Sequence, residues 1–295
     1  MSLRDILLVL AICAAWAGNF LFSAHALLEV PAFLYTALRM AIVALVLLPF
    51  LKPVPRAQWP RFLAVALCMN VFHFGLSFWS LRMAGELSAV AIVMQSYVPM
   101  SALLAWWVLG ERFAWRTGTA IAASFAGVLV IGFDPSIIDK PAALAAMRAA
   151  AAFLALGTVL MRRLGGIALA TQQGWSALIA VLPLLAISFV LEPDGLASLA
   201  DASPRAWIGV GYSALVASLL GHGMYFLLLQ RHPVAQLTPW LLLTPLLAVA
   251  LGIVFWGDIP GPQLWIGGAL VLGGVAAIAL RALARSRTLA PAREI

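Results

Sequence analysis

Long apolar runs separated by short polar connections extend along the whole chain. Each run is long enough to cross a bilayer, because some twenty residues of α-helix span roughly 30 Å. The pattern predicts an all-α integral membrane protein with ten transmembrane helices and no separate soluble domain. The ten runs cover residues 5–24, 31–51, 61–81, 87–108, 115–133, 146–161, 171–191, 206–229, 235–256 and 262–280.

A second pattern relates the two halves of the chain. Pro99 is followed 146 positions later by Pro245, and His73 is followed 149 positions later by His222. Each half contains five runs, and an odd number makes the second half enter the membrane from the opposite side. We therefore predict two inverted five-helix repeats and a short cytoplasmic tail, at residues 1–140, 141–283 and 284–295.

The fourth and ninth runs each carry a proline near their middle, Pro99 and Pro245. An internal proline removes one backbone hydrogen bond and kinks a helix. Broken helices in corresponding positions of two halves point to a substrate site between them. We expect both prolines to act as hinges, with Tyr97 and Trp240 beside the breaks and lining a cavity.

Composition agrees with a membrane location. Of the 295 residues, 64% are hydrophobic and only 10% are charged, whereas soluble domains carry about 25% charged residues. Most basic residues lie between the apolar runs or at their ends and form no patch, which argues against nucleic-acid binding. Cys13 and Cys68 lie inside apolar runs and are expected to behave as small buried hydrophobes.

The distribution of Lys and Arg predicts the orientation. With the N-terminus in the cytoplasm, thirteen basic residues fall on the cytoplasmic side and four on the other, so both termini are predicted to be cytoplasmic. The first run ends in Ala24-His25-Ala26, which is similar to a signal-peptidase site. Its apolar part is longer than a usual signal sequence, and its removal would destroy the repeat, so we expect it to be retained.

Charged and titratable residues inside the runs are few. All eleven carboxylates lie at run ends or in connections, which argues against transport coupled to an ion through a buried carboxylate. Arg39 lies inside the second run, where it either binds a substrate carboxylate or has a structural role. His73 and His222 form a hydrogen-bonding site, a proton relay or a bis-histidine haem site, or are structural.

Aromatic and polar residues within the runs are candidates for contacts with a small substrate. Each has an alternative role in bilayer packing or in a hydrogen bond between helices. Motifs typical of enzymes are missing from the sequence, and no metal or cofactor is expected. The remaining candidates are Trp16, Asn19, Tyr35, Trp79, Gln95, Thr158, Gln173, Trp175 and Thr244.

The fifth and tenth runs differ from the others. They have almost no polar residues, and small residues recur four positions apart, as in Ala123 with Gly127 and Ala269 with Gly273. Such faces let helices approach closely. We expect these helices to provide scaffold or subunit contacts in a monomer or homodimer.

Several of these stretches resemble the EamA-type branch of the drug/metabolite transporter superfamily. The resemblance covers nearly the whole chain and is most similar to the YddG-type exporters of aromatic amino acids. It implies a basket of spans one to four and six to nine around a central cavity, with spans five and ten outside. The matching stretches are Trp16-Ala17-Gly18-Asn19-Phe20, the Arg39-containing run, Tyr97-Val98-Pro99, Leu109-Gly110-Glu111-Arg112, Thr244-Pro245 and Trp256-Gly257-Asp258, where Asp258 replaces the usual Glu.

These observations predict a secondary transporter of a bacterial inner membrane. We expect it to export small amphipathic metabolites, above all aromatic and other neutral amino acids, by facilitated alternating access without ion coupling. Two alternatives stay open. One is a membrane-embedded redox protein or enzyme that uses His73 and His222, and the other is a carrier for drugs or phosphorylated solutes.

Overall fold

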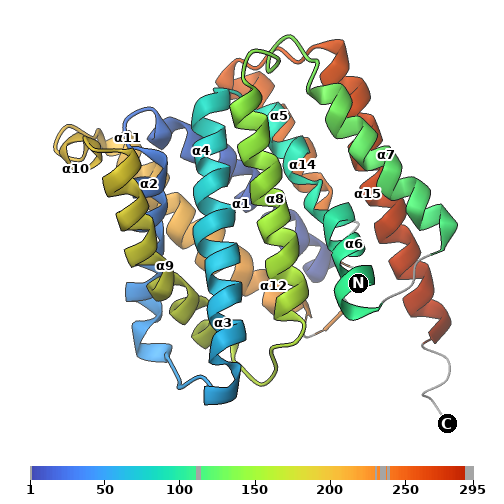
Figure 1. Cartoon of the computed structure of the whole chain (residues 1–295), viewed down its shortest axis with the longest axis horizontal. Coiled ribbons are helices and arrows are strands. Elements are labelled where there is room, and N and C mark those ends of the chain that lie inside the picture. Colours follow the sequence, from blue (N-terminus) through green and yellow to red (C-terminus); the bar gives the residue numbers. More distant parts are fainter. Residues whose placement is uncertain (1, 111–113, 230, 233–236, 238–239, 290–295) are drawn as a thin grey trace.

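The computed structural model describes residues 2–110, 114–229, 231–232, 237 and 240–289, and all regular structure within them is helical (Figure 1). Glu111 and Arg112 of the sequence motif, and the end of the tail from residue 290, lie outside the described residues. The long helices are α1 (Leu3–Leu27), α2 (Ala32–Leu47), α4 (Phe74–Ala84), α6 (Tyr97–Leu109), α7 (Trp115–Ile131), α8 (Pro141–Met161), α9 (Leu169–Leu191) and α15 (Pro262–Leu289). The shorter α-helices are α3 (Trp59–Ala66), α5 (Leu87–Met94), α10 (Gly195–Ser198), α11 (Pro204–Gly211), α12 (His222–Leu229) and α14 (Leu243–Leu251).

Helices occupy the apolar runs, and seven of the described helices are long and apolar enough to cross a membrane. Two further apolar helices, Trp115–Ile131 and Leu243–Trp256, are shorter. Large apolar side chains such as Trp107, Leu182 and Phe189 are at least three-quarters exposed, as expected for a surface in contact with lipid. Ten crossings in an inverted repeat stay a prediction.

Helices from the two halves of the chain pack against each other. α2 lies along α9, α4 lies along α8, and α7 lies along α15 (Figure 1). α1 likewise contacts α11 and α14. In each pair one member comes from residues 1–140 and the other from 141–283, so the core is shared between the halves.

The helix interruption predicted at Pro99 lies just before the proline. α5 ends at Met94, Gln95 and Ser96 form a turn, and Pro99 is the third residue of α6. Pro245 is likewise the third residue of α14. Both prolines therefore lie in the first turn of a helix, where the missing N–H has no intrahelical acceptor to lose. The break comes from the start of a new helix and not from a kink within a continuous one.

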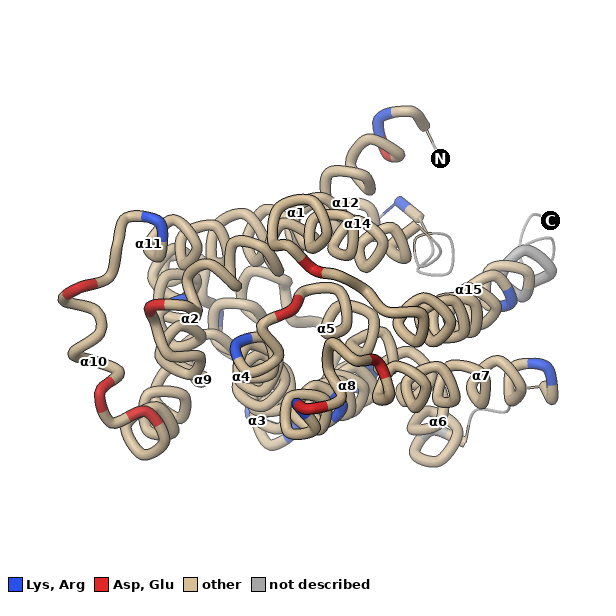
Figure 2. Tube along the Cα trace, turned by 90° about the horizontal axis from the view of Figure 1, so that it is seen from above, with Lys and Arg blue, Asp and Glu red and all other residues tan. Residues whose placement is uncertain are grey.

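Carboxylates cap helices at one end of the bundle, which we call the acidic end (Figure 2). Glu192 accepts hydrogen bonds from the amides of Phe33 and Leu34 at the start of α2, both at 3.1 Å. Asp258 accepts from the amide of Ser88 near the start of α5 at 2.8 Å. A negative charge at a helix N-terminus is stabilising, because it satisfies free amides and opposes the helix dipole.

Two more carboxylates of the acidic end have the same role. Asp134 accepts a 2.7 Å hydrogen bond from the amide of Leu264 at the start of α15. Glu29 accepts from the amide and hydroxyl of Ser203, the residue that caps α11, at 2.6 and 2.7 Å. All four carboxylates accept hydrogen bonds at the start of a helix of the other half of the chain, so they hold the halves together at this end.

Candidate functional site

Arg39 is the centre of the polar interior. It lies in α2 with 2% of its surface exposed, and its Nε donates a 3.0 Å hydrogen bond to the Ser218 hydroxyl. The guanidinium lies over the ring of Phe74 at 4.1 Å and near that of Phe78 at 5.3 Å. Its Nη1 is buried without a hydrogen-bond partner, and Arg39 takes part in none of the ion pairs between described residues. A buried charge is costly unless paired, so this nitrogen is available to an anionic ligand.

The two histidines face the interior in the same way. His73 Nδ1 donates to the carbonyl of Ala150 at 3.1 Å, and His222 Nδ1 donates to the carbonyl of Ser218 at 3.0 Å. Because both acceptors are carbonyls, Nδ1 carries the proton and Nε2 is left as a hydrogen-bond acceptor. The Arg39 guanidinium lies within electrostatic range of both imidazoles.

Local π-helical turns position these histidines. The segment η3 (Leu67–His73) ends at His73, and η4 (Tyr212–Gly221) ends just before His222. A π-turn shifts the helix register and frees carbonyls, which is why such segments are frequent at functional sites. In η4 the shifted register places the carbonyl of Ser213 where it accepts a 2.8 Å hydrogen bond from the Ser218 hydroxyl.

Ser218 joins three helical segments in what we call the central cluster, which consists of Arg39, His73, Gln173, Ser218 and His222. Its hydroxyl accepts from Arg39 of α2, and its carbonyl accepts from Gln173 Nε2 of α9 at 3.0 Å. The same carbonyl accepts from His222. The cluster therefore depends on both halves of the chain.

Aromatic rings lie beside the central cluster. Trp16 donates from Nε1 to the carbonyl of Ala217 at 3.1 Å, and its ring is 5.3 Å from that of His222 and 5.8 Å from that of Tyr225. Tyr97, the first residue of α6, lies within electrostatic range of Tyr225. These rings supply an apolar surface on which a flat side chain can pack.

A second group of predicted residues lies toward the acidic end. The hydroxyls of Ser23 and Tyr35 are 2.7 Å apart, and Ser23 also donates to Asn19 at 3.4 Å. Tyr35 is fully buried and meets Phe78 edge-on at 5.0 Å. Phe78 also lies near Arg39, so this group is continuous with the central cluster.

Other predicted residues make contacts elsewhere. Thr158 donates to the carbonyl of Leu154 in its own helix, and Trp79 packs on Phe33 at 6.2 Å. Trp175 donates to the carbonyl of Lys52 and meets Trp59 at the end of the bundle opposite the acidic end. Gln95 lies in the turn before α6, Thr244 is buried beside Cys13, and the Trp240 carbonyl accepts from Cys13 Sγ at 3.5 Å.

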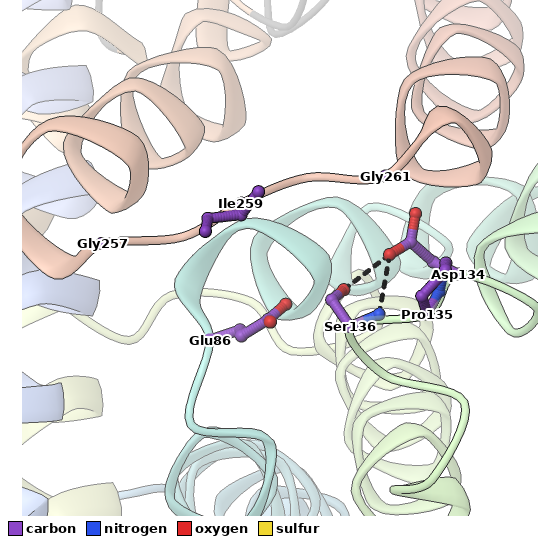
Figure 3. Close-up of a pocket in the computed structure, with 7 residues that line it drawn as sticks. All are labelled: Glu86, Asp134, Pro135, Ser136, Gly257, Ile259 and Gly261. Carbon is purple, nitrogen blue, oxygen red and sulfur yellow. Dashed lines mark hydrogen bonds between the residues drawn. The ribbon is translucent and has the colours of Figure 1, made fainter.

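A hollow of about 360 Å³ opens at the acidic end, away from the central cluster (Figure 3). Glu86, Asp134 and Ser136 line it beneath the connection from Gly257 to Gly261. Burial raises the pKa of Glu86, and the nearby carboxylates Asp258 and Asp134 raise it further against the Ser136 hydroxyl and Lys140. Burial also raises the pKa of Asp134, but hydrogen bonds from Ser136 and the Leu264 amide outweigh it and hold that pKa below its usual value.

The described residues contain no group of three or more His, Cys, Asp or Glu side chains that could hold a metal ion. The central cluster offers one cationic donor and two imidazole acceptors, and several aromatic rings lie beside it. This combination suits a small zwitterion with a flat side chain, because carboxylate, ammonium and ring each meet a complementary group. Ser218 is not predictable from the sequence, since a serine in an apolar run has no distinctive local signal.

The fold and this centre define a multi-pass helical membrane protein built around a buried polar cluster. A family description matches residues 3–133 and 141–280, and the chain belongs to the EamA-like transporter family, within the drug/metabolite transporter superfamily. The chain is 28% identical to a probable amino-acid metabolite efflux pump of Salmonella typhimurium, over 93% of this chain and 94% of that protein. The corresponding Escherichia coli protein is 25% identical with the same coverage.

A probable terminal-alkyne amino-acid exporter of Streptantibioticus cattleyicolor is 28% identical over 76% of this chain and 75% of its own length. A solved crystal structure superposes with a TM-score of 0.64 at 20% identity, covering 95% of this chain and 97% of the other. That likeness shows a shared fold.

Proposed function

We propose that this protein exports amino acids, with a preference for aromatic ones, and that Arg39 binds the substrate carboxylate. The observation that carries the proposal is the buried Arg39 guanidinium, whose Nη1 has no partner. A carboxylate is the natural ligand for such a group, because Arg forms strong, directional hydrogen bonds with it. The names of the relatives support an amino-acid substrate and the direction of transport.

The neighbours of Arg39 supply the rest of the substrate site. The free Nε2 atoms of His73 and His222 would accept hydrogen bonds from the substrate ammonium. Trp16, Tyr97 and Tyr225 would contact its side chain, and planar rings favour an aromatic one. The Gln173 amide and the Ser218 hydroxyl hold this surface in place through the hydrogen bonds described above.

The transport cycle we propose is facilitated alternating access. Arg39 is enclosed by side chains, so a solute reaches it only when helices separate on one side. The paired interruptions before Pro99 and Pro245 provide two places where a half-helix can move independently. The central cluster contains no carboxylate to carry a coupling proton or sodium ion, so the substrate gradient would drive transport.

Uptake of an amino-acid panel into proteoliposomes tests the proposed function. Phenylalanine, tryptophan and tyrosine are expected to enter vesicles that contain the protein faster than protein-free vesicles, and lysine and glutamate are not. Equal rates for all amino acids with and without protein would contradict the proposal.

A redox or enzymatic role for the histidines is the main alternative. Both imidazoles are oriented through Nδ1 by backbone carbonyls, as metal-binding histidines commonly are. A Soret band or stoichiometric metal in the purified protein would favour this reading over transport. A carrier of phosphorylated solutes would need several interior cations, and Arg39 is the one arginine or lysine of the central cluster.

A further inference from the structure

The paired helices α7 and α15 form one flank of the bundle (Figure 1). Their close approach accounts for several glycines. A Cβ added to Gly127 would lie 2.5 Å from the carbonyl oxygen of Gly267, and one added to Gly274 would lie 2.5 Å from that of Ala120. These positions must be glycine for the two backbones to touch, so helix packing explains them fully.

Gly273 has no such explanation. A Cβ added there would meet no atom within 4 Å, and the residue is exposed. Gly273 lines a groove of about 480 Å³ between the two helices, together with Ala123, Ala269 and Ala277. A larger side chain at Gly273 would fill the groove without disturbing the helix contact. The small residues on the groove's surface therefore keep it open beyond what helix packing requires.

Two arginines line the same groove at the end of the bundle opposite the acidic end. Arg116 is the second residue of α7, and Arg281 lies on the last turns of α15. Neither side chain takes part in the ion pairs between described residues. Arg116 lies 5.5 Å from the ring of its neighbour Trp115, which is 73% exposed. An exposed Trp next to Arg is typical of the depth of lipid headgroups.

The length of the groove matches one leaflet of a bilayer. Ala269 and Arg281 are twelve residues apart on α15, which corresponds to about 18 Å of helix. Half of the hydrocarbon core of a bilayer is about 15 Å thick. An acyl chain that starts at the depth of the arginines would therefore end near Ala269.

We propose that the α7–α15 groove binds one anionic phospholipid. Its phosphate would lie between Arg116 and Arg281, and one acyl chain would pack along Ala123, Ala269 and Gly273. The charge of the two arginines selects an anionic over a zwitterionic headgroup, as in other basic pockets between transmembrane helices. The site is separate from the central cluster and is independent of the proposed transport function.

Native mass spectrometry of the detergent-solubilised protein tests the site, with phosphatidylglycerol and phosphatidylethanolamine offered in equal amounts. The wild type is expected to retain one phosphatidylglycerol molecule in preference to phosphatidylethanolamine. The double variant Arg116→Gln/Arg281→Gln is expected to lose that preference, with binding weakened at least about fivefold, the factor expected for one basic residue at an anionic surface. Arg56→Gln is the matched control, since Arg56 is an exposed arginine outside the groove.

Gly273→Leu tests the apolar part of the groove. It is expected to weaken retention of both lipids and to leave the melting temperature unchanged, because no atom stands in its way. Equal retention of the two lipids by the wild type, or an unchanged preference in the double arginine variant, would overturn the proposal. A change in oligomeric state without any change in bound lipid would identify the occupant as a second copy of the chain, and would overturn it as well.

Discussion

Replacement of Arg39 by Gln is the most informative single change, because it removes the interior charge and leaves a hydrogen-bonding side chain. Gln can still bond the Ser218 hydroxyl, as Arg39 Nε does at 3.0 Å. No buried ion pair is broken, since Arg39 has no carboxylate partner among the described residues. We therefore expect Arg39→Gln to stay folded and monodisperse, with a melting temperature that is unchanged or raised.

The effect on binding follows from the free Nη1 of Arg39. A hydrogen bond to a charged group contributes about 1.5–3 kcal/mol, which corresponds to about 10- to 150-fold in affinity. The affinity of the Arg39→Gln variant for phenylalanine is expected to be lower than that of the wild type by this factor. Phenethylamine, which has the same ring and ammonium but no carboxylate, is expected to bind the variant and the wild type about equally.

Isothermal titration calorimetry of both ligands with both proteins measures directly how much the interaction between Arg39 and the ligand carboxylate contributes to affinity. The preference of the wild type for phenylalanine over phenethylamine is expected to disappear in Arg39→Gln. Arg39→Lys keeps the charge but cannot bond Ser218 and a carboxylate together in the geometry of a guanidinium, so an intermediate result is expected. An equal preference in wild type and Arg39→Gln would refute the role of Arg39 as the carboxylate ligand.

Three further predictions follow. Pro99→Ala and Pro245→Ala are expected to fold normally but to slow proteoliposome transport strongly, because each lets a helix extend through its interruption; near-normal rates would remove the hinge role. Glu86→Gln is expected to raise the melting temperature at neutral pH. The pKa of Glu86 is raised, so the folded state favours its protonated form, and the stability this gives is present at low pH and lost as the pH rises through the folded pKa. The difference is expected to vanish below about pH 4, and an equal difference at both pH values would contradict it. A reporter fused after Ile295 is expected to be active only in the cytoplasm, and activity on the other side would refute the ten-span topology.

The sequence predicts much of the helical architecture because helix formation here depends on residues that are close together in the chain. Apolar runs of bilayer length form helices wherever they occur, and the interruption near Pro99 follows from turn residues and a proline within a few positions. Arg39 could be singled out for the same reason, since a charge inside an apolar run is rare. His73 and His222 stood out through their matching positions in the two halves.

What the sequence did not reveal depends on contacts between distant segments. Glu192 caps α2 across 159 positions, and Asp258 caps α5 across 170. Such pairings arise only when the helices pack, so a carboxylate in a connection gives no local sign of its partner. The π-turns before the histidines are of the same kind, because nothing in the residues of η4 distinguishes it from an α-helix. Trp175 is among the candidates for substrate contact in the sequence, yet its ring lies at the end of the bundle beside Trp59.

Solute counterflow tests the central claim most directly. Proteoliposomes loaded with excess unlabelled phenylalanine, without any ion gradient, are diluted into a trace of labelled phenylalanine. We expect a transient accumulation of label that needs the protein, changes little with an imposed pH gradient, and is strongly reduced in Arg39→Gln. No accumulation above protein-free vesicles would contradict amino-acid transport, and accumulation only with a proton gradient would contradict facilitated exchange.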